Sequence, residues 1–180
     1  MTRFPMRRRI VVAGELIAIL ATCVVGVLLL QSGKHSLPQI SDAMNRMRSV
    51  RVSGSAMSPT LHDGQQVTVD THAYRDLSPE RGDIVLIATP NHQSVFFRVI
   101  AVPGDRVMIR SGQVLLNGAV LSEPYVRDLW TINTFWPAGG RQVTVPPDHY
   151  FVLGDNRDQA KDSRTNGFVP TSAIEGELQP

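Results

Sequence analysis

Residues 81–105 read RGDIVLIATPNHQSVFFRVIAVPGD. The stretch contains two short runs rich in Val, Ile and Phe, at 83–88 and 94–102, and turn-forming residues separate and bound them. Short runs of β-branched and aromatic residues that end at Gly, Pro or Asn are typical of neighbouring β-strands. The stretch therefore predicts two consecutive strands, the second of which ends at Pro103-Gly104-Asp105.

The same pattern continues on both sides of this stretch. Ser111-Gly112 separates the runs 106–110 and 113–116 and predicts a tight hairpin. Further runs of the same kind lie at 67–69, 142–145 and 149–153. Beyond the N-terminal region, no helical pattern longer than about ten residues is convincing. The sequence therefore predicts an all-β body of curled antiparallel sheets.

Charge is concentrated near the N-terminus. The 180 residues include 18 Lys and Arg and 16 Asp and Glu, but four of the arginines and only Glu15 lie in the first 31 residues. The remainder holds 14 basic and 15 acidic residues, a formal charge of −1. A body without excess positive charge argues against a protein that binds nucleic acid.

Residue types that bind metals or form disulfides are scarce. Cys23 is the single cysteine, which excludes a disulfide framework and a thiolate-built zinc site. The five histidines are scattered, and no Gly-rich loop leads into Lys-Ser or Lys-Thr. We therefore expect neither a metal nor a cofactor.

Residues 10–30 predict a transmembrane helix. These 21 residues are apolar or small except for Glu15 and Thr22, and as a helix they reach roughly 30 Å, the thickness of a bilayer core. A cleaved signal peptide is the alternative, but its apolar region usually spans about 7–15 residues, and the run ends in LLLQ, a poor cleavage site. Arginines precede the span, which favours a cytoplasmic N-terminus. We thus expect a cytoplasmic basic tail at 1–9, a plasma-membrane anchor at 10–30, a juxtamembrane stalk at 31–50 and an extracytoplasmic β domain at 51–180.

Four blocks of sequence resemble the bacterial type I signal peptidases in their order and spacing. They are VSGSAMSPTL at 52–61, RGDIV at 81–85, FRVIAVPGD at 97–105 and GDNRDQAKDSR at 154–164. The resemblance implies the curled sheets of that family behind one N-terminal membrane helix. It also implies a membrane-bound serine peptidase that removes signal peptides at the outer face, with a serine nucleophile and a lysine base.

The chain departs from that family where the chemistry takes place. The first block places Ala56 at the nucleophile position, directly before Met57, and the third block places Phe97 at the position of the base. Ala160 stands where the family usually has a serine that hydrogen-bonds the base. A serine attacks an amide only if a base takes its proton, and a lysine does so only when burial keeps it neutral. The resemblance therefore predicts a pseudoenzyme.

Neighbouring residues offer a poor replacement for the serine nucleophile and the lysine base, the catalytic dyad of that family. Ser55 and Ser58 flank the Ala56-Met57 pair, but adjacent side chains on an extended segment point to opposite sides. The chain has two lysines, Lys34 beside the predicted anchor and Lys161 in the fourth block. Arg98 does not deprotonate at usable pH, and nothing in the sequence places a histidine beside Ser55.

The framework of the family's site is retained. Matching residues are Gly54, Met57, Pro59, Asp155, Asn156, Asp162 and Arg164. By its motif position, the pair Asp162 and Arg164 is expected to buttress the site; the alternative is a surface ion pair that contributes about 0–1 kcal/mol.

The sequence leaves three functional hypotheses. The favoured one is a membrane-anchored accessory protein that binds signal-peptide-like or extended segments of exported or surface proteins by strand addition without cleaving them. The second is an active signal peptidase that uses the displaced Ser55 or Ser58. The third is a scaffold partner of an active paralogous signal peptidase.

Overall fold

The computed structural model describes residues 46–89, 93–126 and 140–180. The chain divides into two units, 1–45 and 46–180. The predicted anchor at 10–30 and residues 31–45 of the predicted stalk lie outside the described residues. In the part of the chain that is described, no helix has the length and apolar character needed to cross a membrane.

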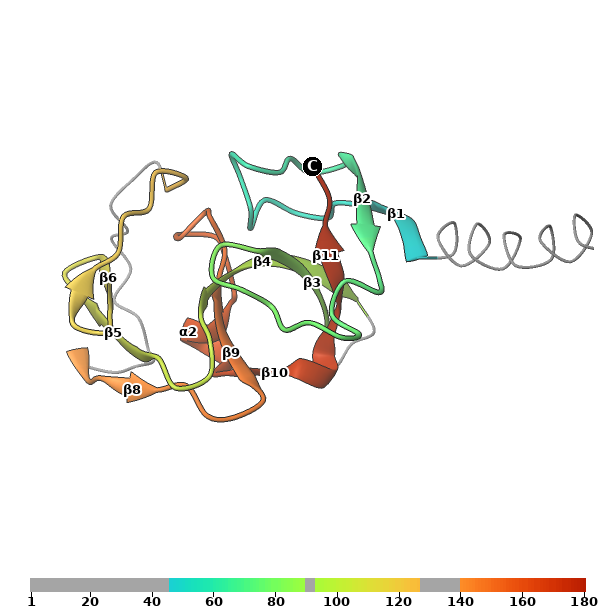
Figure 1. Cartoon of the computed structure of the whole chain (residues 1–180). Helices are drawn as coiled ribbons and strands as arrows, with labels where there is room; N and C mark the ends of the chain where they lie inside the picture. Colours follow the sequence, from blue (N-terminus) through green and yellow to red (C-terminus); the bar gives the residue numbers. More distant parts are fainter. Residues whose placement is uncertain (1–45, 90–92, 127–139) are drawn as a thin grey trace, which may run out of the picture. The chain divides into compact units, whose positions relative to one another are not determined.

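The larger of two antiparallel sheets has seven strands (Figure 1). Their order across the sheet is β1 (Met47–Arg51), β2 (Gln66–Asp70), β11 (Ile174–Leu178), β3 (Ile84–Ala88), β4 (Ser94–Ala101), β9 (His149–Leu153) and β10 (Val169–Pro170). β3 and β4 pair in the register Val85 opposite Phe97. This pairing confirms the two consecutive strands predicted from residues 81–105.

The smaller sheet has four strands and holds the predicted hairpin. Its order is β7 (Ala119–Val120), β6 (Gln113–Leu116), β5 (Arg106–Arg110) and β8 (Val143–Thr144). Ser111 and Gly112 join β5 to β6 with φ angles of 50° and 71°. Positive φ at both central residues defines the turn that matches the twist of a hairpin, so this prediction is confirmed.

Two short helical turns follow β9. They are α2 (Ser163–Asn166) and a 3₁₀ turn (Thr171–Ala173). Asp162 caps α2, and its side chain accepts a hydrogen bond from the Arg164 amide at 3.1 Å. The cap thereby fixes the end of the fourth sequence block to the turn that follows it.

Four strands differ from the sequence-based expectation. The structure places β1 at Met47–Arg51, where the stalk is expected, and the sequence predicts neither β11 at Ile174–Leu178 nor the two-residue strands β7 and β10. β1 is an exposed edge strand with arginines, and β11 has a central glycine, so neither shows a clear apolar alternation. The β domain thus begins earlier than expected.

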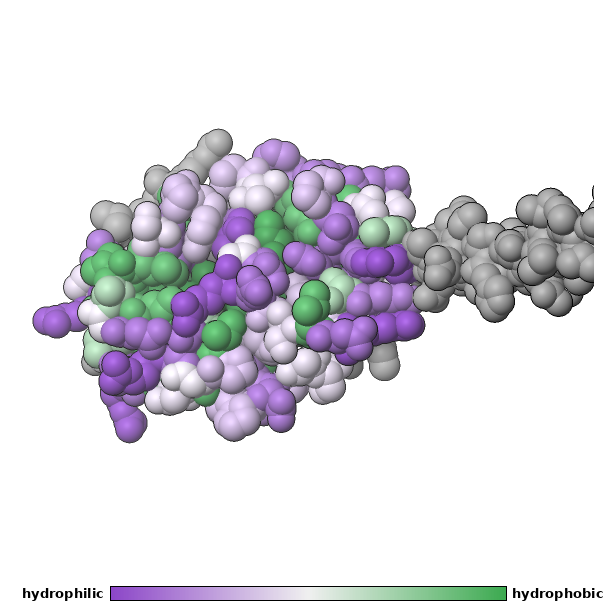
Figure 2. All heavy atoms as spheres, viewed as in Figure 1, coloured by the Kyte–Doolittle hydropathy of each residue, from purple (hydrophilic) through white to green (hydrophobic). Residues whose placement is uncertain are grey.

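Three apolar clusters form the core. One joins the two sheets through residues such as Ile100, Val107 and Phe151. The other two lie on the larger sheet: one contains Val69 and Phe96, and the other contains Phe97. On the face drawn in Figure 2, hydrophobic residues gather over β5 and β6, while most of the remaining surface is polar.

Candidate functional site

The segment that follows β1 forms a series of turns. The Ser58 amide donates to the Ser55 carbonyl at 3.1 Å, and the Leu61 amide donates to the Met57 carbonyl at 2.9 Å. The expectation that Ser55 and Ala56 point to opposite sides assumed an extended chain. The segment turns instead of running extended, and both residues border the same groove.

The structure brings together the three positions where polar groups are missing. Phe97 on β4 belongs to an apolar cluster, and Ala56 and Ala160 both pack against that cluster. Phe97 is 7% exposed, so its ring fills space that a lysine stem would otherwise occupy. An ammonium group at this position would be surrounded by apolar side chains, the setting that favours a neutral lysine.

Gly154 allows the first and fourth blocks to approach each other closely. A Cβ at this position would lie 2.4 Å from Ala160 Cβ and 2.5 Å from the Ala56 carbonyl oxygen. The same carbonyl accepts a hydrogen bond from the Asn156 amide at 3.0 Å. The loop after β9 therefore lies directly against the turn that carries Ala56.

A groove of about 980 Å³ opens beside these positions. Its walls are mainly apolar and include Ala56, Phe97, Val95, Val152, Val169 and Pro170. Ser55 and Lys161 contribute polar groups to the same groove. Both of these side chains are exposed, so Lys161 lacks the apolar enclosure that a neutral lysine base requires.

The other described residues considered as a displaced nucleophile or base lie away from the groove. Ser58 borders a separate cavity of about 130 Å³ together with Asp155 and Asn156. Of the histidines in the described ranges, His62, His72 and His149, none borders the groove; His92 lies outside the described residues. Of the residues considered as a displaced nucleophile or base, Ser55 and Lys161 therefore share the groove, which Thr89 and Ser163 also border.

Asp162 and Arg164 form a buried pair. Asp162 accepts hydrogen bonds from Arg164 Nε and Nη2, both at 2.8 Å, and from the Gly154 amide at 2.9 Å. The two side chains are 0% and 6% exposed, so the pair is not a solvated surface contact. It fixes the loop that carries Ala160 to the strand end at Gly154.

A second ion pair, between the partly buried Arg98 and the buried Asp155, lies in a network that connects all four sequence blocks. Arg98 Nε and Nη2 donate to the Asp155 carboxylate at 2.9 and 2.7 Å, and Arg98 Nη1 donates to the Gly82 carbonyl at 2.8 Å. Thr60 Oγ1 donates to the same carboxylate at 2.5 Å. The Arg98 guanidinium lies 4.1 Å from the centre of the Tyr125 ring. The sequence identifies Asp155 as a framework residue and excludes Arg98 as a base, but no spacing rule predicts the network that connects them.

The electrostatics keep Arg98 charged. Burial lowers its pKa, but the hydrogen bonds and charge of Asp155 raise it more, so its pKa is above the ordinary value. Arg98 therefore cannot serve as a base next to Phe97. In the described ranges, no three His, Cys, Asp or Glu side chains are grouped to hold a metal ion.

The chain is similar to known signal peptidases. Residues 41–180 match the family described as "Signal peptidase, peptidase S26". "Probable signal peptidase I-2" of Synechocystis sp. is 36% identical over 132 residues, which cover 69% of this chain and 58% of that protein. "Signal peptidase IB" of Staphylococcus aureus is 30% identical over 139 residues, which cover 71% of this chain and 73% of that protein. The chain thus spans little more than half the length of the Synechocystis relative.

A solved structure is similar as well. The crystal structure of a signal peptidase I from Enterococcus faecalis V583 has 35% sequence identity and a TM-score of 0.47, and the match covers 57% of this chain and 97% of that one.

Proposed function

Because this chain belongs to the peptidase S26 family of signal peptidases, we propose that it is a signal peptidase I homologue that binds extended peptide segments and does not cleave them. One observation carries the proposal: Ala56, Phe97 and Ala160 pack against one apolar cluster. Their side chains provide neither a hydroxyl to attack a peptide bond nor an amine to accept its proton. In a well-studied serine protease, loss of the nucleophile or base lowers the rate about 10⁶-fold.

The groove is suited to an extended peptide. Val169 and Pro170 of β10 border it, and β10 is the last strand of the larger sheet in the described part of the chain. An edge strand can pair with the backbone of a peptide, while pockets beside it receive alternate side chains. Neither form of recognition needs a nucleophile. The proposed ligands are signal-peptide-like segments of exported or surface proteins.

The proposed location is the plasma membrane. Residues 10–30 serve as a single membrane span, with the basic tail at 1–9 in the cytoplasm. The β domain then lies outside the cytoplasm, where exported proteins emerge. The proposal rests on the hydropathy and charge of these residues, which lie outside the described part of the chain.

A displaced dyad is the competing proposal, since Ser55 and Lys161 border the same groove. The exposure of Lys161 opposes it, because a lysine base requires an apolar enclosure that this side chain lacks. Cleavage that is abolished by Ser55→Ala and by Lys161→Met would establish this alternative, and cleavage abolished by Ser58→Ala would establish the other displaced serine.

The test is a binding experiment with the full chain in detergent micelles. A fluorescent peptide that spans a signal-peptide cleavage site, with Ala at −1 and −3, is titrated and followed by anisotropy. We expect saturable binding to the unaltered chain. Ala88→Glu, which places a charge at the groove, weakens it at least tenfold because Ala88 borders the groove and is exposed.

Ala119→Glu is the matched control. Ala119 is also exposed but lies on β7 of the smaller sheet, so the same change there leaves binding unaltered. Equal binding by both variants, or no binding by the unaltered chain, would overturn the proposal. No binding together with co-purification of an active signal peptidase would instead support the scaffold hypothesis.

A further inference from the structure

A second cavity lies against the same face of the larger sheet as the groove. Its volume is about 750 Å³, and none of the residues around it borders the groove. Asp83 borders this cavity and Ile87 borders the groove. Asp83 directly precedes β3, on which Ile87 lies. Tyr150 and Val152, two positions apart on β9, border the cavity and the groove respectively, so their side chains face the same side of the sheet. The cavity, here called the acidic pocket, and the groove thus lie along one sheet face.

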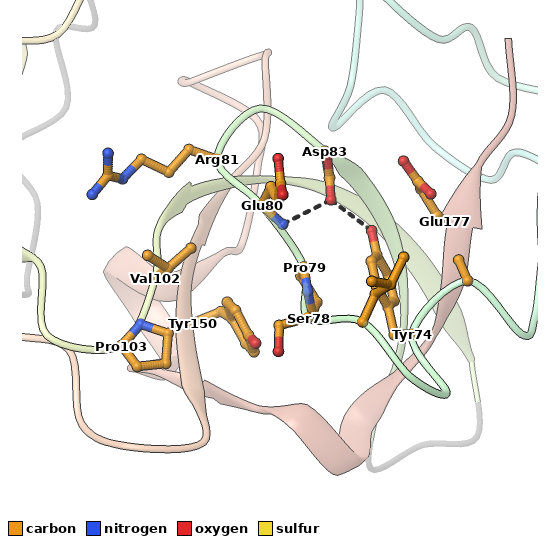
Figure 3. A pocket seen from close by; sticks show the side chains of 12 residues that line it. Tyr74, Ser78, Pro79, Glu80, Arg81, Asp83, Val102, Pro103, Tyr150 and Glu177 are labelled. Carbon is orange, nitrogen blue, oxygen red and sulfur yellow. Dashed lines mark hydrogen bonds between the residues drawn. The ribbon is translucent and has the colours of Figure 1, made fainter.

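Three carboxylates border the acidic pocket: Glu80, Asp83 and Glu177 (Figure 3). Asp83 accepts hydrogen bonds from the Tyr74 hydroxyl and from the Glu80 amide, both at 2.8 Å. These bonds hold the Asp83 carboxylate in place without neutralising its charge. Apolar parts of Tyr74, Val102 and Pro103 form the walls beside it.

Within the described residues, no cation forms an ion pair with these three carboxylates. Arg81 borders the pocket, but its guanidinium donates to both oxygens of Asp105 at 2.8 and 2.5 Å. In Figure 3 the Arg81 side chain extends away from the other labelled residues. The pocket therefore carries three acidic groups and an arginine that is already paired.

Tyr150 provides an independent sign of a ligand. The residue is 3% exposed, and its ring extends from β9 with the hydroxyl directed into the pocket (Figure 3). Among the described residues, nothing hydrogen-bonds this hydroxyl, and it is not sealed in the core. The hydroxyl is therefore the accessible end of an otherwise buried side chain, and it can hydrogen-bond a group that enters the pocket.

The negative charges of the empty acidic pocket destabilise the folded protein. Burial raises the pKa of Glu177, and the negative charges of Asp83 and Asp70 raise it further. Folding thus favours the protonated form of Glu177, and its charge at neutral pH opposes folding. An entering cation would relieve this repulsion.

We propose that the acidic pocket binds the guanidinium group of an arginine side chain in a peptide, through its three carboxylates and the Tyr150 hydroxyl. A guanidinium is planar, presents five donors in different directions and stacks on aromatic rings, so it fits carboxylates that are spread around tyrosine walls. A metal ion would need its ligands gathered around one point, and no such group exists among the described residues. The pocket shares no residue with the peptide groove; the guanidinium site is independent of the proposed function, and only the choice of a peptide as its carrier rests on it.

The test is calorimetric titration of the full chain in micelles with the blocked peptide acetyl-Gly-Arg-Gly-amide. The same peptide with citrulline, a neutral group of the same shape, is the matched ligand. We expect the arginine peptide to bind at least about tenfold more tightly, the effect of a charge-assisted contact. Free arginine binds more weakly than the peptide, because its own carboxylate meets an acidic pocket.

Two variants separate binding from folding. Glu177→Gln weakens arginine-peptide binding at least about tenfold while the melting temperature stays the same or rises, because the change removes a charge that opposes folding. Tyr150→Phe weakens binding about threefold. The control Asp148→Asn removes an exposed acid outside the pocket and leaves binding unchanged, as does the groove variant Ala88→Glu.

Other results would overturn the inference. Equal binding of the arginine and citrulline peptides, or no binding of either, would show that the pocket does not recognise a guanidinium. Unchanged affinity in Glu177→Gln would place the binding elsewhere. Free arginine that binds as tightly as the peptide would reject a peptide ligand.

Discussion

Arg98 and Asp155 are 57 positions apart and form a two-pronged ion pair, with Arg98 Nε and Nη2 donating to separate carboxylate oxygens at 2.9 and 2.7 Å. Their side chains are 13% and 0% exposed. The pair holds β4, which carries Phe97, against the loop after β9, which lies on the Ala56 turn. The pair therefore joins the segments that carry Phe97 and Ala56.

Removal of one partner from this pair should destabilise the fold strongly. Arg98→Met leaves a buried carboxylate without its cation, and such a loss costs about 3–5 kcal/mol of unfolding free energy. Urea denaturation measures the change. In the control Arg81→Met the lost cation is 49% exposed, and the buried Asp105 keeps hydrogen bonds from the Val102 amide and the Asn117 side chain, so this change should cost less than Arg98→Met. Equal effects of the two substitutions would contradict the structural role given to Arg98.

Gly154 should tolerate no side chain. In Gly154→Ala the new methyl group would lie 2.4 Å from Ala160 Cβ and 2.5 Å from the Ala56 carbonyl oxygen, so the backbone must move. We expect a loss of about 1–3 kcal/mol in urea denaturation, typical of an overpacked core, together with weaker binding of the cleavage-site peptide. The double variant Gly154→Ala/Ala160→Gly removes one of the two clashes and should recover part of the stability. A fully stable Gly154→Ala variant would contradict the close contact between the two blocks.

Stability should fall in acid through Asp105. Burial raises its pKa, but hydrogen bonds from Arg81 and Asn117 lower it more, so its pKa in the folded protein is below the ordinary value. Its contribution to stability is complete above its unfolded pKa of about 3.9 and is lost as the pH falls through the lower folded pKa. The melting temperature of Asp105→Asn should thus depend less steeply on pH between about 4 and 2. Parallel curves for the two proteins would contradict this assignment.

Much of the fold follows from local sequence signals, and the rest depends on tertiary contacts. Ser111-Gly112 specifies the β5–β6 hairpin because both residues adopt positive φ. The sequence does not predict β1, because an exposed edge strand needs no apolar face and so shows no apolar pattern. Its pairing with β2 determines its conformation.

The candidate site likewise depends partly on local sequence signals and partly on tertiary contacts. The convergence of Ala56, Phe97 and Ala160 follows from the motif register. The turn at Ser55 combines local hydrogen bonds with the contact between Asn156 and the Ala56 carbonyl. The acidic pocket around Tyr150 arises from contacts between distant segments, which no local pattern indicates.

Restoring the serine and lysine side chains at the three positions should restore peptide-bond cleavage. In Ala56→Ser/Phe97→Lys/Ala160→Ser, the new ammonium group would lie in an apolar cluster, which favours a neutral lysine, beside a serine in the same groove. We expect the triple variant to cleave a preprotein with small residues at −1 and −3, and Ala56→Ser alone to remain inactive because it lacks a base. Cleavage is followed by gel shift and mass spectrometry. A folded triple variant that binds the peptide without cleaving it would contradict an intact geometry.

The most direct measurement is the fate of a preprotein held by the unaltered chain. A preprotein at a concentration that saturates binding is incubated with the full chain in micelles, and its mass is recorded by mass spectrometry over many hours. The account predicts that the bound preprotein keeps its full mass. The appearance of a mature-length product that disappears in Ser55→Ala would contradict it.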